Sequence, residues 1–115
     1  MIFVIDDDRI MAKCIVSYVR EETLVFANAI DAMDKIAEGI IPKMIFLDIL
    51  LDGPDGFTFL NELVSYNDTA KIPVVIVTSL DINKNSLATY GVVGMLNKEI
   101  MRPEDIRRYV EQYSK

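Results

Sequence analysis

Histidine is absent from this chain, and cysteine occurs once, at Cys14. The lack of histidine excludes Ser-His-Asp and Cys-His nucleophilic sites, together with every imidazole metal site. A single cysteine excludes an intramolecular disulfide and a thiolate cluster. We therefore expect Cys14 to be a small apolar residue on a helix face, in a reducing compartment.

Basic residues are outnumbered, and long apolar runs are missing. Twelve Lys and Arg residues against eighteen Asp and Glu residues give a net charge of −6, which repels nucleic acid phosphates and anionic lipid surfaces. No apolar run approaches the ~18 residues of a membrane span, and the start of the chain lacks the pattern of a signal peptide. We therefore expect a cytoplasmic protein that binds neither nucleic acid nor membrane.

The chain has 115 residues, of which 51% are hydrophobic and 26% are charged. This length suits one domain, and the composition is ordinary for a globular protein. No linker, low-complexity tract or internal repeat divides the chain. The sequence thus predicts a single domain over residues 1–115, with no DNA-binding or enzymatic output segment, whose output is contact with a downstream protein target.

Short apolar runs alternate five times with amphipathic segments. The runs are residues 2–5, 24–26, 44–47, 74–77 and 92–96, and the segments with helical spacing are 10–19, 29–37, 57–64, 83–90 and 103–113. The helix signal is weakest in 83–90, where Asn, Ser and Thr dilute it. Continuous runs of Val, Ile, Leu and Phe are typical of strands buried on both faces of a parallel sheet. The pattern predicts an α/β fold, built as a three-layer α/β/α sandwich.

Polar residues follow four of the five predicted strands. They are Asp6, Asp7 and Asp8, then Asp48, then Thr78 and Ser79, and finally Asn97 and Lys98. The carboxyl ends of parallel strands lie at one edge of the sheet, where α/β proteins bind ligands. Three carboxylates gathered there would repel one another without a cation, and hard oxygen ligands favour Mg²⁺. A hydroxyl and an amine nearby could then contact a phosphoryl group.

Each of these residues also has a purely structural interpretation. Asp8 could cap the following helix, Asp48 could be a turn residue, and Lys98 could be a surface lysine. Taken singly, the structural interpretation is the better one each time. Their occurrence together on the ends of four strands is what favours a site.

Four segments carry a resemblance to a known family. They are residues 3–8, residues 45–48 followed by Asp55-Gly56, residues 73–79, and Gly91 with residues 95–98. In this order and spacing they resemble the receiver domains of two-component response regulators. The resemblance implies a five-stranded parallel sheet in the flavodoxin-like order 2-1-3-4-5 with five helices. It also implies that Asp48 accepts a phosphoryl group from a histidine kinase or a histidine phosphotransfer protein.

The resemblance also implies roles for the residues around Asp48. The implied Mg²⁺ ligands are Asp6, Asp7, Asp48 and the backbone carbonyl of Leu50. The residues implied to contact the phosphoryl oxygens are Thr78, Ser79 and Lys98. The implied switch pair, which would change conformation on phosphorylation, is Thr78 and Met95.

Two positions depart from the family pattern. Glu99 follows Lys98 where proline, commonly after a cis bond, is usual, so a trans bond and a different approach of Lys98 are expected. Met95 stands where an aromatic residue is usual, which weakens the expectation of a two-state rotamer switch. The signal readout depends on these positions more than the acceptor chemistry does.

Two apolar residues suggest a property beyond family membership. Leu50 lies two residues after Asp48, and Leu80 lies two residues after Thr78, where side chains flank the path of an attacking water. We expect both to hinder this water and to fail to orient it, so that the aspartyl phosphate hydrolyses slowly. The alternative is that both residues only pack beneath the loops.

The surface formed by segments 83–90, 92–96 and 103–113 is the usual switch face of the family. Its candidate residues in this chain are Leu87, Tyr90, Met95, Arg102 and Tyr109. The same face is a candidate for homodimer formation. The aromatic and basic side chains among them could equally belong to the core or to a solvated helix surface.

Two other functions compete with a phosphoryl-accepting receiver. Asp6-Asp7-Asp8 also fits the start of haloacid-dehalogenase-like phosphatases, with Asp6 as the nucleophile. Against this, the chain is short, Ile10 stands where Thr or Val is usual, and no acidic pair follows Lys98. The third candidate is a phosphorylation-independent interaction module, which Glu99 and Met95 favour.

Overall fold

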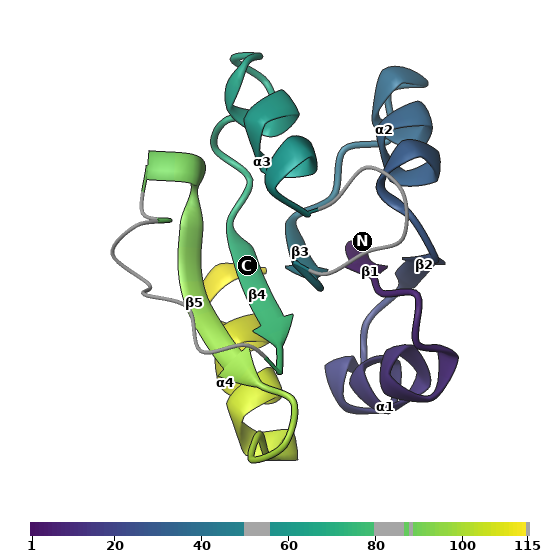
Figure 1. The fold of residues 1–115 in the computed structure, drawn as a ribbon, viewed down its shortest axis with the longest axis vertical. Coiled ribbons are helices and arrows are strands. Elements are labelled where there is room, and N and C mark those ends of the chain that lie inside the picture. Colours follow the sequence, from purple (N-terminus) through teal and green to yellow (C-terminus); the bar gives the residue numbers. More distant parts are fainter. Residues whose placement is uncertain (50–55, 80–86, 88, 115) are drawn as a thin grey trace.

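Strands and helices alternate along the chain in the computed structural model, which describes residues 1–49, 56–79, 87 and 89–114 (Figure 1). The strands are β1 (Ile2–Ile5), β2 (Thr23–Phe26), β3 (Met44–Leu47), β4 (Val74–Thr78) and β5 (Val92–Asn97). The helices are α1 (Arg9–Val19), α2 (Ala29–Ala37), α3 (Gly56–Val64) and α4 (Pro103–Tyr113). Each strand coincides closely with a predicted apolar run.

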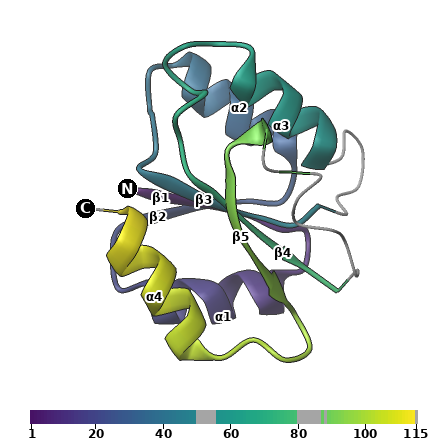
Figure 2. The same ribbon diagram turned by 90° about the vertical axis from the view of Figure 1, so that its left-hand side faces the viewer.

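The five strands form one parallel sheet in the order β2-β1-β3-β4-β5. Helices α1 and α4 cover one face of this sheet, and α2 and α3 cover the other (Figure 2). The predicted three-layer sandwich and strand order are therefore confirmed. Because all strands run the same way, their carboxyl ends lie along one edge of the sheet.

The described residues contain four α-helices, where the sequence predicted five. The missing one was predicted over residues 83–90, most of which lie outside the described residues. The described members of this segment, Leu87, Thr89 and Tyr90, adopt 3₁₀ rather than α-helical geometry. Weak helix formers in the segment are consistent with this difference.

The central strands are buried along their whole length. Every residue of β1, β3 and β4 is inaccessible to solvent, and Phe3 packs edge-on against Phe26 with ring centroids 4.8 Å apart. Burial on both faces explains why these strands are continuous apolar runs rather than alternating ones. None of the described helices has the length and apolar character that crossing a lipid bilayer requires.

Candidate functional site

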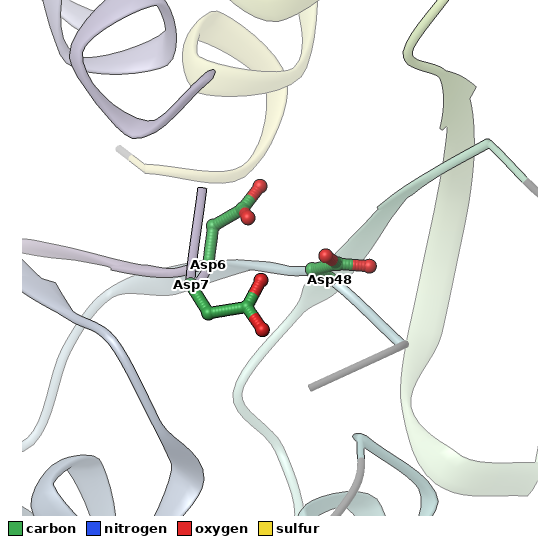
Figure 3. Close-up of side chains that lie close together, drawn as sticks. All are labelled: Asp6, Asp7 and Asp48. Carbon is green, nitrogen blue, oxygen red and sulfur yellow. The ribbon is translucent and has the colours of Figure 1, made fainter. Parts of the chain in front are cut away.

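Three carboxylates converge where β1 and β3 end (Figure 3). These strands are neighbours, with Ile5 opposite Leu47, so Asp6 and Asp48 leave the sheet side by side. Backbone hydrogen bonds continue the sheet through both residues, including one from Asp48 N–H to the Ile5 carbonyl at 2.9 Å. One carboxylate oxygen from each of Asp6, Asp7 and Asp48 lies within 4.8 Å of the others. Asp6 and Asp48 are buried, whereas Asp7 is exposed.

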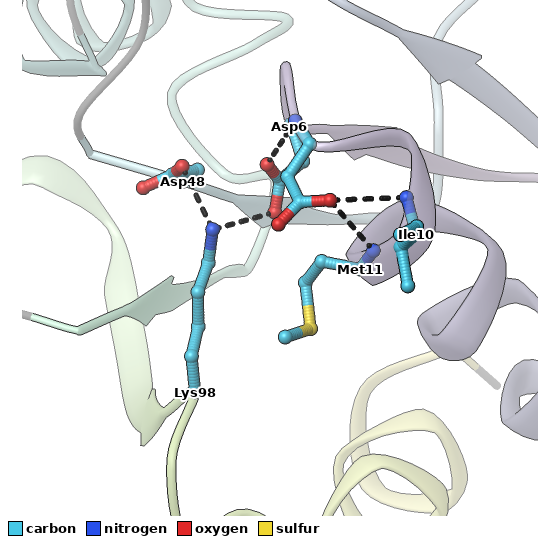
Figure 4. A network of polar contacts seen from close by, with 6 residues as sticks. Asp6, Ile10, Met11, Asp48 and Lys98 are labelled. Carbon is cyan, nitrogen blue, oxygen red and sulfur yellow. Dashed lines mark hydrogen bonds and ion pairs between the residues drawn. The ribbon is translucent and has the colours of Figure 1, made fainter.

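Asp8 points away from this cluster and caps α1. Its Oδ1 accepts hydrogen bonds from the backbone N–H groups of Ile10 at 3.0 Å and Met11 at 3.2 Å (Figure 4). Its own N–H donates to Asp6 Oδ1 at 2.9 Å. Asp8 therefore stabilises the helix start and orients Asp6, while its carboxylate is committed to the cap.

Lys98 reaches the cluster from the end of β5. Its Nζ lies 3.0 Å from Asp48 Oδ2 and 3.0 Å from Asp6 Oδ2 (Figure 4). The hydrogen bond from Lys98 N–H to the Thr78 carbonyl, at 3.0 Å, holds this end of β5 against β4. The Lys98–Glu99 peptide is trans, like all others in the described part of the chain. Lys98 therefore contacts both carboxylates even though the residue that follows it is Glu99 rather than proline.

The charges in this site are unevenly stabilised. Burial raises the pKa of Asp6 above its usual 3.8, and the Asp8 N–H bond and the Lys98 charge only partly oppose this. Burial alone would lower the pKa of Lys98, but its contacts with Asp48 and Asp6 outweigh it and raise that pKa above 10.5. The ammonium therefore stays charged at neutral pH, whereas the negative charge of Asp6 is costly.

The donor set fits a hard divalent cation. The buried Oδ2 of Asp6 lies 3.0 Å from Lys98 Nζ and has no other polar partner among the described residues. Three ionised carboxylates beside one ammonium leave an excess negative charge. Carboxylate oxygens alone, without nitrogen or sulfur ligands, are what Mg²⁺ prefers.

The other predicted site residues lie at the same edge of the sheet or outside the described residues. Thr78 ends β4, is buried and lies opposite Asn97, whereas Ser79 is exposed. Met95 lies opposite Ile76 and is half-buried against the apolar layer beneath α2 and α3. Two predicted positions, Leu50 and Leu80, lie outside the part of the chain that the structure describes.

One residue predicted on the switch face is in fact in the core. Leu87 is only 1% exposed and packs in the apolar layer beneath α2 and α3. The prediction was wrong because a single leucine in a weakly helical segment does not indicate which side of that segment faces the core. Tyr90 and Tyr109 are half-buried, and Arg102 is exposed. Leu87 therefore does not belong to that surface.

Sequence reasoning missed the close contact that Gly56 makes with the end of β3. Gly56 begins α3, and its N–H donates to the Ile49 carbonyl at 3.1 Å. A Cβ atom at this position would lie 2.7 Å from Ile49 Cα and 3.1 Å from the Asp48 carbonyl oxygen. A glycine at the start of a predicted helix was the available signal of a close backbone contact. Only the folded chain shows that this contact is with the backbone of Asp48 and Ile49.

Replacing Gly56 with Ala will destabilise the protein by about 2–3 kcal/mol, because the atoms that must move are backbone. Gly39→Ala is the matched control, since a Cβ there meets nothing within 4 Å and adds only the strain of its φ of +97°. We expect that control to lower the free energy of unfolding by only about 1 kcal/mol. Urea denaturation of both variants measures the difference, and equal losses would contradict the proposed backbone contact.

A family model described as the response regulator receiver domain matches residues 2–111. Among curated proteins, the response regulator PleD of Caulobacter vibrioides is 32% identical over 82 residues, which are 70% of this chain and 18% of that protein. The aligned segment therefore spans less than a fifth of the length of this relative.

Solved structures agree in fold. The receiver domain of NtrX from Brucella abortus has a TM-score of 0.82 at 22% identity, covering 99% of this chain and 98% of that one. The receiver domain of the sensor histidine kinase PA1611 from Pseudomonas aeruginosa, solved with a magnesium ion in its active-site cleft, has a TM-score of 0.81 at 16% identity, covering 98% and 95%. The family model spans nearly all of the strands and helices described above, and the chain belongs to the response regulator receiver domain family.

Proposed function

We propose that residues 1–115 form one receiver domain, in which Asp48 accepts a phosphoryl group from a histidine kinase or a histidine phosphotransfer protein. The observation that supports this most directly is the convergence of the Asp6, Asp7 and Asp48 carboxylates, with Lys98 Nζ 3.0 Å from Asp48 Oδ2. Asp48 combines a buried, oriented carboxylate with an adjacent fixed positive charge, as a nucleophile for phosphoryl transfer requires.

In the proposed reaction, a carboxylate oxygen of Asp48 forms a bond to phosphorus. The phosphorus–nitrogen bond to the donor histidine breaks, and the imidazole nitrogen keeps the electron pair. Lys98 then pairs with a phosphoryl oxygen, and Thr78 and Ser79 are the proposed hydroxyl donors to the same group. The ligands of Mg²⁺ would be Asp6, Asp7, Asp48 and the backbone carbonyl of Leu50. When bound, the ion would neutralise negative charge on the phosphoryl group.

Labelling with acetyl phosphate tests this function without the cognate kinase. We expect one phosphoryl group per chain, located at Asp48 by borohydride trapping and tandem mass spectrometry, with Mg²⁺ and not with EDTA. No labelling under either condition would favour the phosphorylation-independent module instead. Labelling at Asp6 would favour phosphatase chemistry, which membership in the receiver family argues against.

The aspartyl phosphate is expected to be long-lived. Leu50 and Leu80 lie outside the described residues, so their proposed role rests on side-chain chemistry: neither can hydrogen-bond an attacking water. Leu50→Asn combined with Leu80→Glu should accelerate phosphate loss about tenfold or more. The control combines Leu50→Ala with Leu80→Ala, which removes the same apolar side chains without adding a polar group that could orient water. Unchanged phosphate loss in the first pair would show that the leucines do not control this rate.

The proposed output is a protein contact at the surface near β5 and the start of α4. Tyr90, Met95, Arg102 and Tyr109 remain candidates for this face, for the downstream target and for a homodimer. Thr78 and Met95 are the proposed pair that reports phosphorylation to it. A flexible methionine in this role favours a graded shift in packing over a two-position rotamer switch.

A further inference from the structure

Helices α2 and α3 lie side by side on one face of the sheet (Figures 1 and 2). Residues of both helices line a groove between them. Two cavities of about 430 and 260 Å³ follow the line where the helices meet. Met33, Asp34 and Glu62 line both cavities, so the two are adjacent, and together they are called the groove. This groove is separate from the carboxylate cluster and from the proposed output face.

The groove has an apolar floor and an apolar rim. Ile36 and Phe59 form part of the floor and are themselves buried in the core, and Met33 is half-buried between the helices. On the rim, Ile30 is 53% exposed and Tyr66 is 55% exposed. Large apolar side chains left open along a groove are typical of a protein contact surface.

The charged residues that line the groove are all acidic. They are Asp34, Glu62 and Asp68, and all three are exposed. Within the described ranges, no ion pair or hydrogen bond to these carboxylates occurs, and the cation nearest in sequence, Lys35, is paired with Glu38 at 3.8 Å. By contrast, the charged residues that line the cavity beside α1 are of both signs: Arg9, Lys13 and Asp6. The groove therefore complements a positively charged ligand with an apolar side.

We propose that the groove between α2 and α3 binds a basic amphipathic helix of a partner protein. Lys or Arg side chains of the partner would pair with Asp34, Glu62 and Asp68, while its apolar side chains rest on Met33 and Tyr66. Both walls are helices of nine residues, about 13 Å long, which matches roughly two to three turns of a docked helix. The residues that line the groove belong to these helices and to the turn after α3. They do not belong to the outer strands β2 and β5, so a partner bound in the groove would not extend the sheet as an extra strand.

Binding of a synthetic helix tests this proposal on the full 115-residue chain. The probe is a fluorescent peptide of about 14 residues, with Lys and Arg on one helical face and Leu on the other. A peptide with Glu in place of the basic residues, and one of the same composition with disordered spacing, serve as controls. Fluorescence anisotropy measures the affinity at low salt, and amide chemical shifts from two-dimensional NMR locate the binding surface.

We expect the basic amphipathic peptide to bind, with shifts concentrated on α2 and α3, and both control peptides to bind at least tenfold more weakly. Asp34→Asn with Glu62→Gln should weaken binding about fivefold or more, and Tyr66→Ser should weaken it further. The matched pair Glu22→Gln with Glu111→Gln removes the same charge from exposed positions elsewhere and should change the affinity less than twofold.

Three results would overturn the proposal. The first is equal weakening by the two charge-matched pairs, which would reduce the effect to net charge. The second is a set of amide chemical shift changes located on α1 or on the outer strands β2 and β5. The third is self-association in sedimentation experiments that Asp34→Asn with Glu62→Gln abolishes, because the occupant would then be a second copy of the chain.

Discussion

Asp48→Asn will lower phosphoryl incorporation from acetyl phosphate by on the order of 100-fold or more. The substitution keeps the size and planarity of the side chain but replaces the attacking carboxylate with an amide, which cannot form an acyl phosphate. The backbone at this position is held by the hydrogen bond to Ile5, so the variant should fold. Intact-mass spectrometry of the chain with Mg²⁺ and acetyl phosphate measures the loss.

The control for this prediction is Asp34→Asn, the same chemical change at an exposed position on α2. It should be labelled at the wild-type rate. If Asp48→Asn were instead labelled as fast as the wild type, the acceptor would lie elsewhere, and the convergence of carboxylates at β1 and β3 would need another explanation.

The architecture could be predicted from the sequence because each strand is a short apolar run buried on both faces. Such runs are typical of the central strands of a parallel sheet, which helices cover on both faces. The predicted placement of polar residues at strand ends followed from the same logic, since a run that ends in aspartate must leave the core there. The structure accordingly brings Asp6, Asp7, Asp48 and Lys98 together, although Lys98 is 50 residues from Asp48.

Features that depend on tertiary contacts were beyond such reasoning. Leu87 was placed on a surface, but the fold turns it into the core. The role of Gly56 arises from the approach of α3 to the backbone at Ile49, which no local pattern encodes. The capping of α1 by Asp8 could be predicted, because Asp8 lies directly before the first residue of that helix.

Lys98→Met will destabilise the metal-free protein at pH 7 by roughly 2 kcal/mol. The ammonium is the cationic partner of Asp6 and Asp48 among the described residues. The side chains of Asp6 and Asp48 are 1% and 6% exposed, and that of Lys98 is 15% exposed. Methionine keeps the apolar stem of the side chain and removes its charge, which leaves the carboxylates to repel one another. Lys35→Met, at a position that is 42% exposed and paired only with Glu38, should change stability by less than about 0.5 kcal/mol.

The destabilisation in Lys98→Met should depend on pH in a defined direction. The pKa of Asp6 is already raised above 3.8 in the folded wild type, so ionising Asp6 opposes folding as the pH rises from 3.8 through the folded pKa. Loss of Lys98 removes a contact that lowers this pKa, and the ionised form becomes costlier still. The gap between variant and wild type should therefore be full at neutral pH. It should close as the pH falls through the raised folded pKa of Asp6, above 3.8, because Asp6 is then protonated in both folded proteins.

Mg²⁺ provides a second readout for the same variant. A cation that binds the folded state stabilises it in proportion to the logarithm of its concentration over its Kd. Because Lys98 occupies the space between Asp6 and Asp48 and competes for their charge, its removal should strengthen Mg²⁺ binding, so millimolar Mg²⁺ should stabilise Lys98→Met more than the wild type in urea denaturation. Phosphoryl incorporation should nevertheless stay well below that of the wild type, because Mg²⁺ replaces the charge of Lys98 in the folded protein but not its contact with the incoming phosphoryl group. Equal stabilisation of both proteins by Mg²⁺ would show that the ammonium and the ion do not share these carboxylates.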